Sequence, residues 1–452
     1  MYRRFRCTLA LLALALLGAG TRRAEAQIPS IQPGPGYNPA DFRVTAFATG
    51  LNFPESMQQL SDGSILVGVS DPVGGSYFSS QGALLRLVDA DKDGVADGPG
   101  TVLFSGLPGE VTAVRQAGAL VFATSALAGS ERISVLRKGA QPSDPLTLEG
   151  SINFTFASGW EHTSFTLAVR AMPTQGQYEL YFNIGSRANF SATTATVGVS
   201  GLISGTANGE SIYRVTVQDL GNSVSVSDLT QIAHGLRNAA GIAFHPTTGD
   251  LYFEDNGIDK PSDRNEPLSA DELNRIAAAD IGGAVEEFGF PSAYIEYRTG
   301  QKVGNLGLDP LIAFQPQPDP FTGSESEGAV EIAFAPPGFP PALRGGLFIG
   351  FHGKFSQAGL VNEENPLLFC DPATGKYFQF IGNDEPNVGH LDGLLATADS
   401  LFVADLSSSG TLNKGDHGVI YQIRYMPRFR ALPALPRRRS PSPSNPPRPH
   451  AH

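Results

Sequence analysis

The stretch "GLRNAAGIAFHPTTGDLYFEDNG", residues Gly235–Gly257, decides the fold. It contains an apolar run, a polar turn and a second apolar run, which is typical of two short antiparallel strands. Arg237 and Asn238 stand directly before the first run, and the acidic pair Glu254 and Asp255 ends the second. The pattern predicts a buried hairpin that carries polar side chains at its lead-in and at its exit.

The same arrangement recurs along the chain. Each copy has a polar lead-in, an apolar strand, a turn and a second apolar strand, and a further short β run follows. The copies span Gly50–Asp71, Gly106–Ser125, His162–Ser186, Gly235–Gly257, Gly328–Gly353 and Gly389–Gly410. Six strand-rich copies at intervals of roughly 50–80 residues predict an all-β protein, a six-bladed β-propeller. A pair of β-sandwiches is the alternative.

A propeller would bring the lead-ins together, because the innermost strand of every blade faces one central channel. Arg237 and Asn238 would lie at the rim of that channel, and His162 holds the corresponding place in the third copy. Lys354 directly follows the second strand of the fifth copy. The remaining histidines, among them His352 and His390, are predicted to be structural or exposed.

The ends of the chain differ from its body. Residues 1–26 combine an Arg-rich start, an apolar run and "AEA", which predicts a cleaved signal peptide and an exported protein, periplasmic or secreted. The apolar run is short for a membrane anchor, and no other segment is long and apolar enough for an integral membrane span. We expect a linker over 27–41, the propeller over 42–426 and a disordered Pro/Arg-rich tail over 427–452.

Charge and cysteine content narrow the function classes. The first 26 residues carry a net charge of +4 and the last 26 carry +6, so the body carries −22 against a total of −12. Such a body repels nucleic acid and anionic lipid and is compatible with cation binding. Cys7 would leave with the signal peptide, so Cys370 has no partner for a disulfide and is predicted to be a buried structural thiol.

The chain resembles the soluble glucose/sorbosone dehydrogenase family. The resemblance covers about residues 42–425 and is carried best by "HGLRNAAGIAFHPTTGDLYFEDNG" followed by "DELNRI". "SMQQLSDGSILVGVSD" and "FPPALRGGLFIGFHG" resemble the family's first-blade hairpin and fifth-blade strand pair. The resemblance implies a six-bladed propeller that holds pyrroloquinoline quinone at one mouth, often binds calcium, and oxidises a sugar or related alcohol. The electron acceptor is unknown.

The resemblance also implies roles for particular residues. His162 would take a proton from the sugar hydroxyl, a task that suits a neutral imidazole near pH 7. Arg237 would stabilise negative charge on the quinone oxygen, Asn238 would hydrogen-bond the cofactor, and Lys354 would pair with a cofactor carboxylate.

Two places depart from the family pattern. Ser186 stands where the family often has an acidic residue that supports the catalytic histidine, and Arg187 follows it. The sixth lead-in carries His390 and Asp392 where the family often has arginines.

Two other functions therefore stay open. One is a non-enzymatic propeller that binds a carbohydrate or a protein in the same mouth. The other is a calcium-dependent lactone hydrolase, which would need acidic ligands inside the channel. The lead-ins offer Glu55, Glu110, Glu161, Glu331 and Asp392 for that purpose.

The segment "DADKDGVAD", residues 89–97, has the spacing of a calcium loop. Gly94 allows the sharp turn, and a backbone carbonyl near Val95 would add a ligand. The flanks read as strands, so we expect an EF-like loop in a β context and not an EF-hand pair. The carboxylates at loop positions 1, 3, 5 and 9 are Asp89, Asp91, Asp93 and Asp97.

A second calcium candidate follows the fourth hairpin. Glu254, Asp255, Asp271 and Glu272 are close in sequence, and so dense a group of like charges usually needs a cation or water. The family resemblance places structural calcium there, with Asp271, Glu272 and the carbonyl of Gly257 as ligands.

Overall fold

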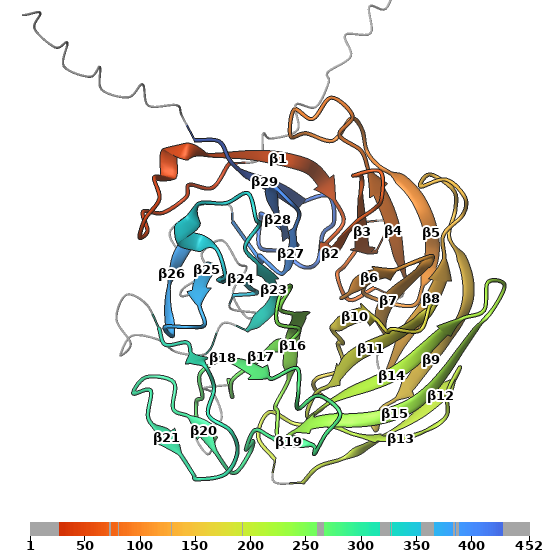
Figure 1. Cartoon of the computed structure of the whole chain (residues 1–452), viewed down its shortest axis with the longest axis vertical. Coiled ribbons are helices and arrows are strands. Elements are labelled where there is room, and N and C mark those ends of the chain that lie inside the picture. The colour runs from red at the N-terminus through yellow and green to blue at the C-terminus, as the bar shows by residue number, and fades with distance from the viewer. Residues whose placement is uncertain are drawn as a thin grey trace, which may run out of the picture.

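The chain folds into a ring of β-sheets around a central axis (Figure 1). The structure is a computed structural model that describes residues 27–427, except 72–73, 80, 128, 192, 260–265, 317–325, 327, 354–365, 383–384 and 386–387. The helices in this part are the short 3₁₀ segments Pro39–Asp41 and Pro341–Leu343. The six-bladed all-β prediction is confirmed.

The first three blades follow one another in sequence, and each starts with its innermost strand. Blade one contains β2 (Pro54–Gln59), β3 (Ile65–Ser70), β4 (Gly82–Leu87) and β5 (Thr101–Leu107). Blade two contains β6 (Val114–Ala117), β7 (Leu120–Leu127), β8 (Ser130–Arg137) and β9 (Thr147–Thr155). Blade three contains β10 (Leu167–Ala171), β11 (Gln177–Ile184), β14 (Ser211–Asp219) and β15 (Val224–His234).

The second half of the ring repeats this order. Blade four contains β16 (Ala239–Phe244), β17 (Leu251–Asp255), β18 (Glu272–Ile276) and β22 (Ile312–Ala313). Blade five contains β23 (Ala329–Phe334), β24 (Leu347–Phe351), β25 (Leu367–Asp371) and β26 (Lys376–Ile381). Blade six contains β27 (Gly393–Ala396), β28 (Ser400–Asp405) and β29 (Gly418–Tyr425).

The outer strand of blade six comes from the other end of the domain. Strand β1 (Phe42–Leu51) pairs antiparallel with β29, from Phe42 opposite Tyr425 to Leu51 opposite Gly418. The first and last strands of the propeller therefore share one sheet, which closes the ring and leaves no gap between blades six and one. The repeat pattern did not reveal this strand, because β1 has no hairpin partner next to it in sequence.

Insertions enlarge the lower part of the ring in Figure 1. Strands β12 (Thr196–Gly201) and β13 (Gly205–Asn208) leave blade three and extend the sheet of blade two through β9. Short strand β19 (Glu286–Glu287) runs parallel to β15, and β20 (Tyr294–Ile295) pairs with β21 (Lys302–Val303). These additions lie on the outside and leave the six innermost strands in place.

Apolar side chains of neighbouring blades pack face to face. Blades two and three share the largest cluster, in which Phe154, Phe165 and Phe182 are almost fully buried. Cys370 belongs to the cluster between blades four and five and is fully buried, as predicted for a structural thiol. Burial raises the pKa of this thiol, and the nearby carboxyl of Glu254 raises it further. No helix in the described part has the length and hydropathy to span a bilayer.

Glu179 on β11 links two arginines on the neighbouring strands of blade three, Arg170 on β10 and Arg214 on β14. Its carboxylate accepts hydrogen bonds from Arg170 and Arg214 and from the hydroxyl of Tyr181. Burial alone would raise the pKa of Glu179, but the hydrogen bonds from Arg170 and Tyr181 and the two positive charges outweigh it, so the pKa is lowered. A lowered pKa means that this contribution to stability is complete above the ordinary pKa of Glu and is lost as pH falls through the folded-state value.

We therefore expect Glu179→Gln to reduce the free energy of unfolding by about 2 kcal/mol at pH 6, where the charged hydrogen bonds are intact. At pH 3 the difference between wild type and variant should shrink, because the wild-type carboxylate becomes protonated. Urea denaturation of both proteins at the two pH values measures this. A difference that does not change with pH would contradict the ionic origin of the contribution.

Candidate functional site

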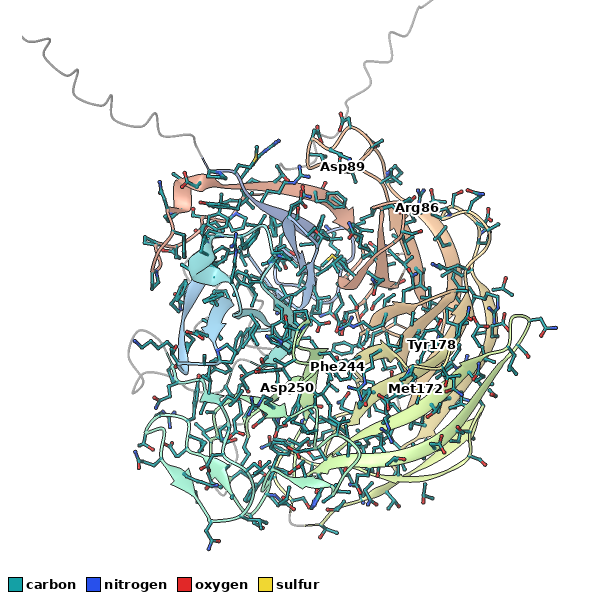
Figure 2. The ribbon with its side chains drawn as sticks, viewed as in Figure 1. Arg86, Asp89, Met172, Tyr178, Phe244 and Asp250 are labelled. Carbon is teal, nitrogen blue, oxygen red and sulfur yellow. The ribbon has the colours of Figure 1, made fainter. Side chains whose placement is uncertain are left out.

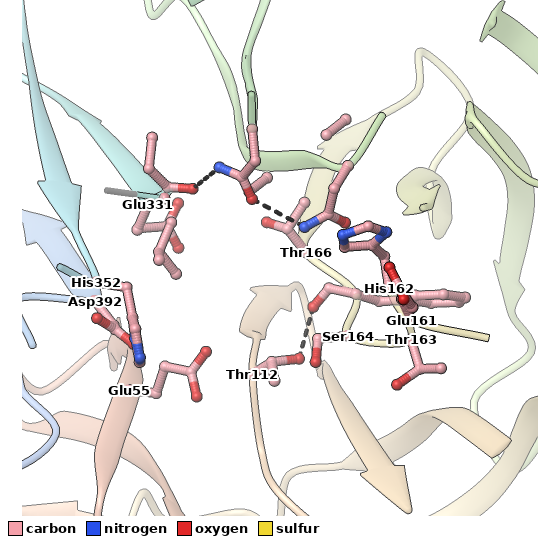
Figure 3. A pocket seen from close by; sticks show the side chains of 18 of the residues that line it. Glu55, Thr112, Glu161, His162, Thr163, Ser164, Thr166, Glu331, His352 and Asp392 are labelled. Carbon is pink, nitrogen blue, oxygen red and sulfur yellow. Dashed lines mark hydrogen bonds and ion pairs between the residues drawn. The ribbon is translucent and has the colours of Figure 1, made fainter. Parts of the chain in front are cut away.

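A cavity of about 530 Å³ opens at the mouth of the central channel, and residues from all six blades line it. Figure 3 shows two different walls. On one side lies the segment from Glu161 to Thr166, which leads into β10, with Arg237 and Asn238 next to it. On the other side lie Glu55, Glu331, His352 and Asp392, which we call the acidic wall. The predicted convergence of His162, Arg237 and Asn238 on one mouth is therefore what the structure shows.

His162 is held by the residue that departs from the family pattern. Its Nδ1 lies 3.0 Å from the carbonyl oxygen of Ser186 and 3.0 Å from the Ser186 hydroxyl. The hydroxyl proton of Ser186 is donated to the carbonyl of Ala188. A carbonyl only accepts, so Nδ1 of His162 carries the hydrogen and the lone pair lies on Nε2. The serine thus fixes the tautomer that a base requires but supplies no negative charge.

Arg237 and Asn238 are fixed by the acidic end of their own hairpin. The Asp255 carboxylate accepts the backbone N–H of Arg237 at 3.1 Å and that of Asn238 at 2.8 Å. Asp405 does the same for Gly389 and His390 in blade six, at 2.9 and 3.0 Å. This explains the polar lead-in and acidic exit of the opening stretch: the carboxylate ties down the chain just before the innermost strand.

The guanidinium of Arg237 is buried and already engaged. It donates to the carbonyl and the side-chain oxygen of Asn189, to Asp259 at 2.9 Å and to the carbonyl of Asn256. Asn238 donates to the side chain of Asn256, and the Oδ1 atom of Asn238 is buried without a hydrogen-bond partner in the described structure. Arg237 therefore lines the cavity as a rigidly held cation paired with Asp259, and Asn238 lines it with a buried acceptor that has no partner in the described structure.

The acidic wall carries more negative than positive charge. Glu331 pairs with Arg115 at 2.6 Å, while Glu55 accepts a hydrogen bond from the Tyr77 hydroxyl at 2.7 Å. Burial raises the pKa of Glu55 well above its ordinary value, and the charge of Asp392 raises it further. Burial also raises the pKa of Glu110, which lines the same cavity, to about 7.

His352 and Asp392 form a pair that no local sequence pattern predicts. Nδ1 of His352 lies 2.7 Å from Oδ2 of Asp392, and the ring of His352 stacks on that of His390 at 4.2 Å. Burial, followed by the influence of His352, lowers the pKa of His390 to about 4, so His390 is neutral at physiological pH. The prediction that His352 is structural missed this pairing because its partner lies 40 positions away.

The five carboxyl groups named for the lactone hydrolase alternative all line the cavity. That alternative therefore has its acidic groups inside the channel. Lys354, the expected partner of a cofactor carboxylate, lies outside the described residues.

The predicted calcium loop lies at the outer edge of blade one, far from the cavity (Figure 2). Asp89, Asp91 and Asp93 each offer an oxygen, and these atoms lie within 4.8 Å of one another. The Asp97 carboxylate instead accepts the N–H of Ala90 at 2.7 Å, and Val95 donates its N–H to Asp93.

The second calcium candidate has a different geometry. Asp271 uses its two oxygens to accept the N–H of Gly257 at 2.7 Å and that of Gly328 at 3.0 Å. Burial is the main cause that raises the pKa of Glu272, to about 8. Within the described residues, Asp255, Asp271 and Glu272 do not form a group of three oxygens as close as that of the Asp89 loop.

Comparison with known protein sequences gives a match over part of the chain. No protein-family model matches the chain. An uncharacterized protein of Borreliella burgdorferi is 30% identical over 149 residues, which are 32% of this chain and 35% of that protein. The chain thus aligns with about a third of that relative's length.

Solved structures match nearly the whole propeller. The calcium structure of a Trichoderma reesei carbohydrate-active enzyme of family AA12 is 16% identical, with a TM-score of 0.57 over 90% of this chain and 99% of that one. The PQQ-bound aldose sugar dehydrogenase of Streptomyces coelicolor is 19% identical, with a TM-score of 0.53 over 85% and 98%. The holo PQQ domain of Coprinopsis cinerea pyranose dehydrogenase is 14% identical, with a TM-score of 0.53 over 90% and 99%. At these identities the likeness establishes a shared propeller fold, and it agrees with the resemblance noted in the sequence.

Proposed function

We propose that this protein is an exported oxidoreductase that oxidises a sugar or related alcohol in the axial cavity by hydride transfer to pyrroloquinoline quinone. The observation that carries the proposal is the convergence of His162, Arg237 and Asn238 on one cavity. The fold shared with PQQ-bound sugar dehydrogenases supports it. The substrate would be a small polyhydroxylated molecule.

The histidine side of the cavity suits this cofactor. Arg237 offers a fixed positive charge and Asn238 a polar side chain, and we infer that these residues would hold the quinone. When bound, the quinone would accept the hydride that leaves the alcohol carbon. The negative charge of the acidic wall would repel the three carboxylates of this cofactor. A positive charge must therefore compensate the charge of the wall on that side.

His162 would act as the base. With the hydrogen on Nδ1 held by Ser186, Nε2 would take the hydroxyl proton as the alcohol becomes a carbonyl. The buried Arg237 would stabilise negative charge that develops in the cavity, and its bonds to Asn189 and Asp259 would keep it in place without reorganisation.

Titration of the purified protein with pyrroloquinoline quinone, followed by absorbance, tests cofactor binding before any substrate is known. Dye reduction with a panel of aldoses then tests turnover. Saturable binding together with dye reduction would support the proposal. Neither binding nor reduction would remove it and leave the non-enzymatic propeller as the better description.

Ser186→Ala should lower kcat about five-fold, because His162 loses one hydrogen bond. We expect that bond to stabilise the required tautomer of His162 by about 1 kcal/mol. KM should stay unchanged, since Ser186 is fully buried and does not line the cavity. Steady-state kinetics measure both values. Ser225→Ala, at an exposed position on β15 of the same blade and outside the cavity, is the control, and equal kcat values for the two variants would contradict the role of Ser186.

We also propose that the Asp89 loop binds structural calcium. With calcium at about 100 times its Kd, binding to the folded state alone would stabilise the protein by about 2.7 kcal/mol. The thermal midpoint of the wild type should rise with calcium and fall again with a chelator, whereas Asp91→Asn should respond little. Asp309→Asn, whose side chain is 78% exposed, is the control. An unchanged calcium response in Asp91→Asn would rule out this loop.

A further inference from the structure

Two carboxylates of the acidic wall are brought together by the way blades one and six meet. Glu55 lies in β2 of blade one, and Asp392 directly precedes β27 of blade six. Gly393 makes this approach possible: a Cβ at that position would lie 1.6 Å from the carbonyl oxygen of Glu55. Figure 3 shows the Glu55 and Asp392 side chains on the same side of the cavity.

The hydrogen bonds on this wall leave acceptor capacity unused. Asp392 is only 2% exposed, its Oδ2 pairs with His352, and its Oδ1 is buried without a hydrogen-bond partner in the described structure. Glu55 is 5% exposed and has the Tyr77 hydroxyl on Oε2. Asp392 lines the cavity, and a buried acceptor without a donor is costly unless a ligand satisfies it.

The two arginines nearest this cavity are bonded to carboxylates other than Glu55 and Asp392. Arg115 pairs with Glu331, and Arg237 pairs with Asp259 on the opposite side. Glu55, Glu110 and Asp392 therefore face the same space with no arginine or lysine bonded to them among the described residues. Two buried like charges at close range need an opposite charge between them or a proton on one of them.

We propose that Glu55 and Asp392 bind a divalent cation on the acidic wall, with water in the rest of its coordination shell. Carboxylate oxygens are the ligands that Mg²⁺ and Ca²⁺ prefer, and Mg²⁺ is commonly held by one or two carboxylates and several waters. Among the described residues, no third acidic side chain joins Glu55 and Asp392 in a group of oxygens within 4.8 Å of one another, so water would supply the other ligands. The cation would compensate the negative charge of this wall toward an anionic ligand.

This site is separate from the calcium loop and does not depend on sugar oxidation. The test starts from the loop-silenced protein Asp91→Asn/Asp93→Asn, without quinone or substrate. The probe is Tb³⁺, an ion with the ligand preferences of Ca²⁺. Tyr77, hydrogen-bonded to Glu55, would sensitise its luminescence at this site. We expect one sensitised Tb³⁺ per protein, and Mg²⁺ or Ca²⁺ should displace it.

Adding Glu55→Gln or Asp392→Asn should weaken Tb³⁺ binding at least ten-fold. Glu331→Gln, whose carboxylate already pairs with Arg115, should change it by less than two-fold. Tyr77→Phe should reduce emission, while calorimetry with Mn²⁺ still detects the site.

Circular dichroism checks the fold of each variant. Without cation, Glu55→Gln should be at least as stable as its parent, because a like-charge repulsion is removed. Binding that is unaffected by Glu55→Gln and Asp392→Asn, or absent from the loop-silenced protein, would overturn the proposal. Tb³⁺ binding that depends on Glu55 and Asp392, together with no dye reduction, would overturn only the proposed sugar oxidation.

Discussion

Replacing His162 with alanine should lower kcat by about 10²–10⁴-fold, the range for loss of a positioned general base. The reason is geometric: Ser186 fixes the hydrogen on Nδ1, so Nε2 is the atom that takes the substrate proton. Quinone binding, followed by absorbance, should persist, because Arg237 and Asn238 remain in place. Steady-state kinetics of wild type and variant at saturating sugar measure the effect.

His417→Ala is the matched control for this experiment. His417 lies in the loop before β29, its side chain is 31% exposed, and it does not line the cavity. Its removal should leave kcat within two-fold of the wild type. A folded His162→Ala protein with wild-type kcat would show that another group, such as the His352–Asp392 pair, takes the proton.

Phe182→Ala should reduce the free energy of unfolding by about 4 kcal/mol, the loss expected for removing a fully buried phenylalanine. Phe182 is fully buried on β11, and its ring lies 5.2 Å from Phe154, 5.8 Å from Phe165 and 6.0 Å from Tyr213, measured between centroids. It therefore joins blades two and three. Urea denaturation, with the slope and midpoint both fitted, measures the loss.

The same substitution should also affect the site. Phe165 packs on Phe182 and lines the cavity three residues after His162, so a void behind it loosens the lead-in that positions the base. Leu220→Ala is the control for stability, because Leu220 is 57% exposed. A loss below 1 kcal/mol in Phe182→Ala would mean that the two blades repack around the void.

The local hairpins were predictable because a short segment of sequence encodes each of them. The alternation of apolar residues and turns in the opening stretch became β16 and β17, and "DELNRI" became β18. The lead-in residues His162, Arg237 and Asn238 were also found, because the repeat fixes where a lead-in ends and an innermost strand begins. Their roles as ligands and base remain predictions.

Other features could not be read from the pattern. Strand β1 joins blade six although its partner β29 lies at the other end of the domain. Arg115 and Glu331, which are 216 positions apart, form an ion pair across the channel. No local signal marks such partners, since they depend on where the closed ring places each blade.

The sequence by itself determined the strands, the turns and the six-fold repeat, because backbone geometry and apolar periodicity act between near neighbours in the chain. The tertiary structure decided which polar side chains face one another: Ser186 behind His162, Asp392 beside His352, and Glu55 next to Asp392. Electrostatic and hydrogen-bond energies depend on distance in space and on burial. These contacts therefore exist only after the ring has closed.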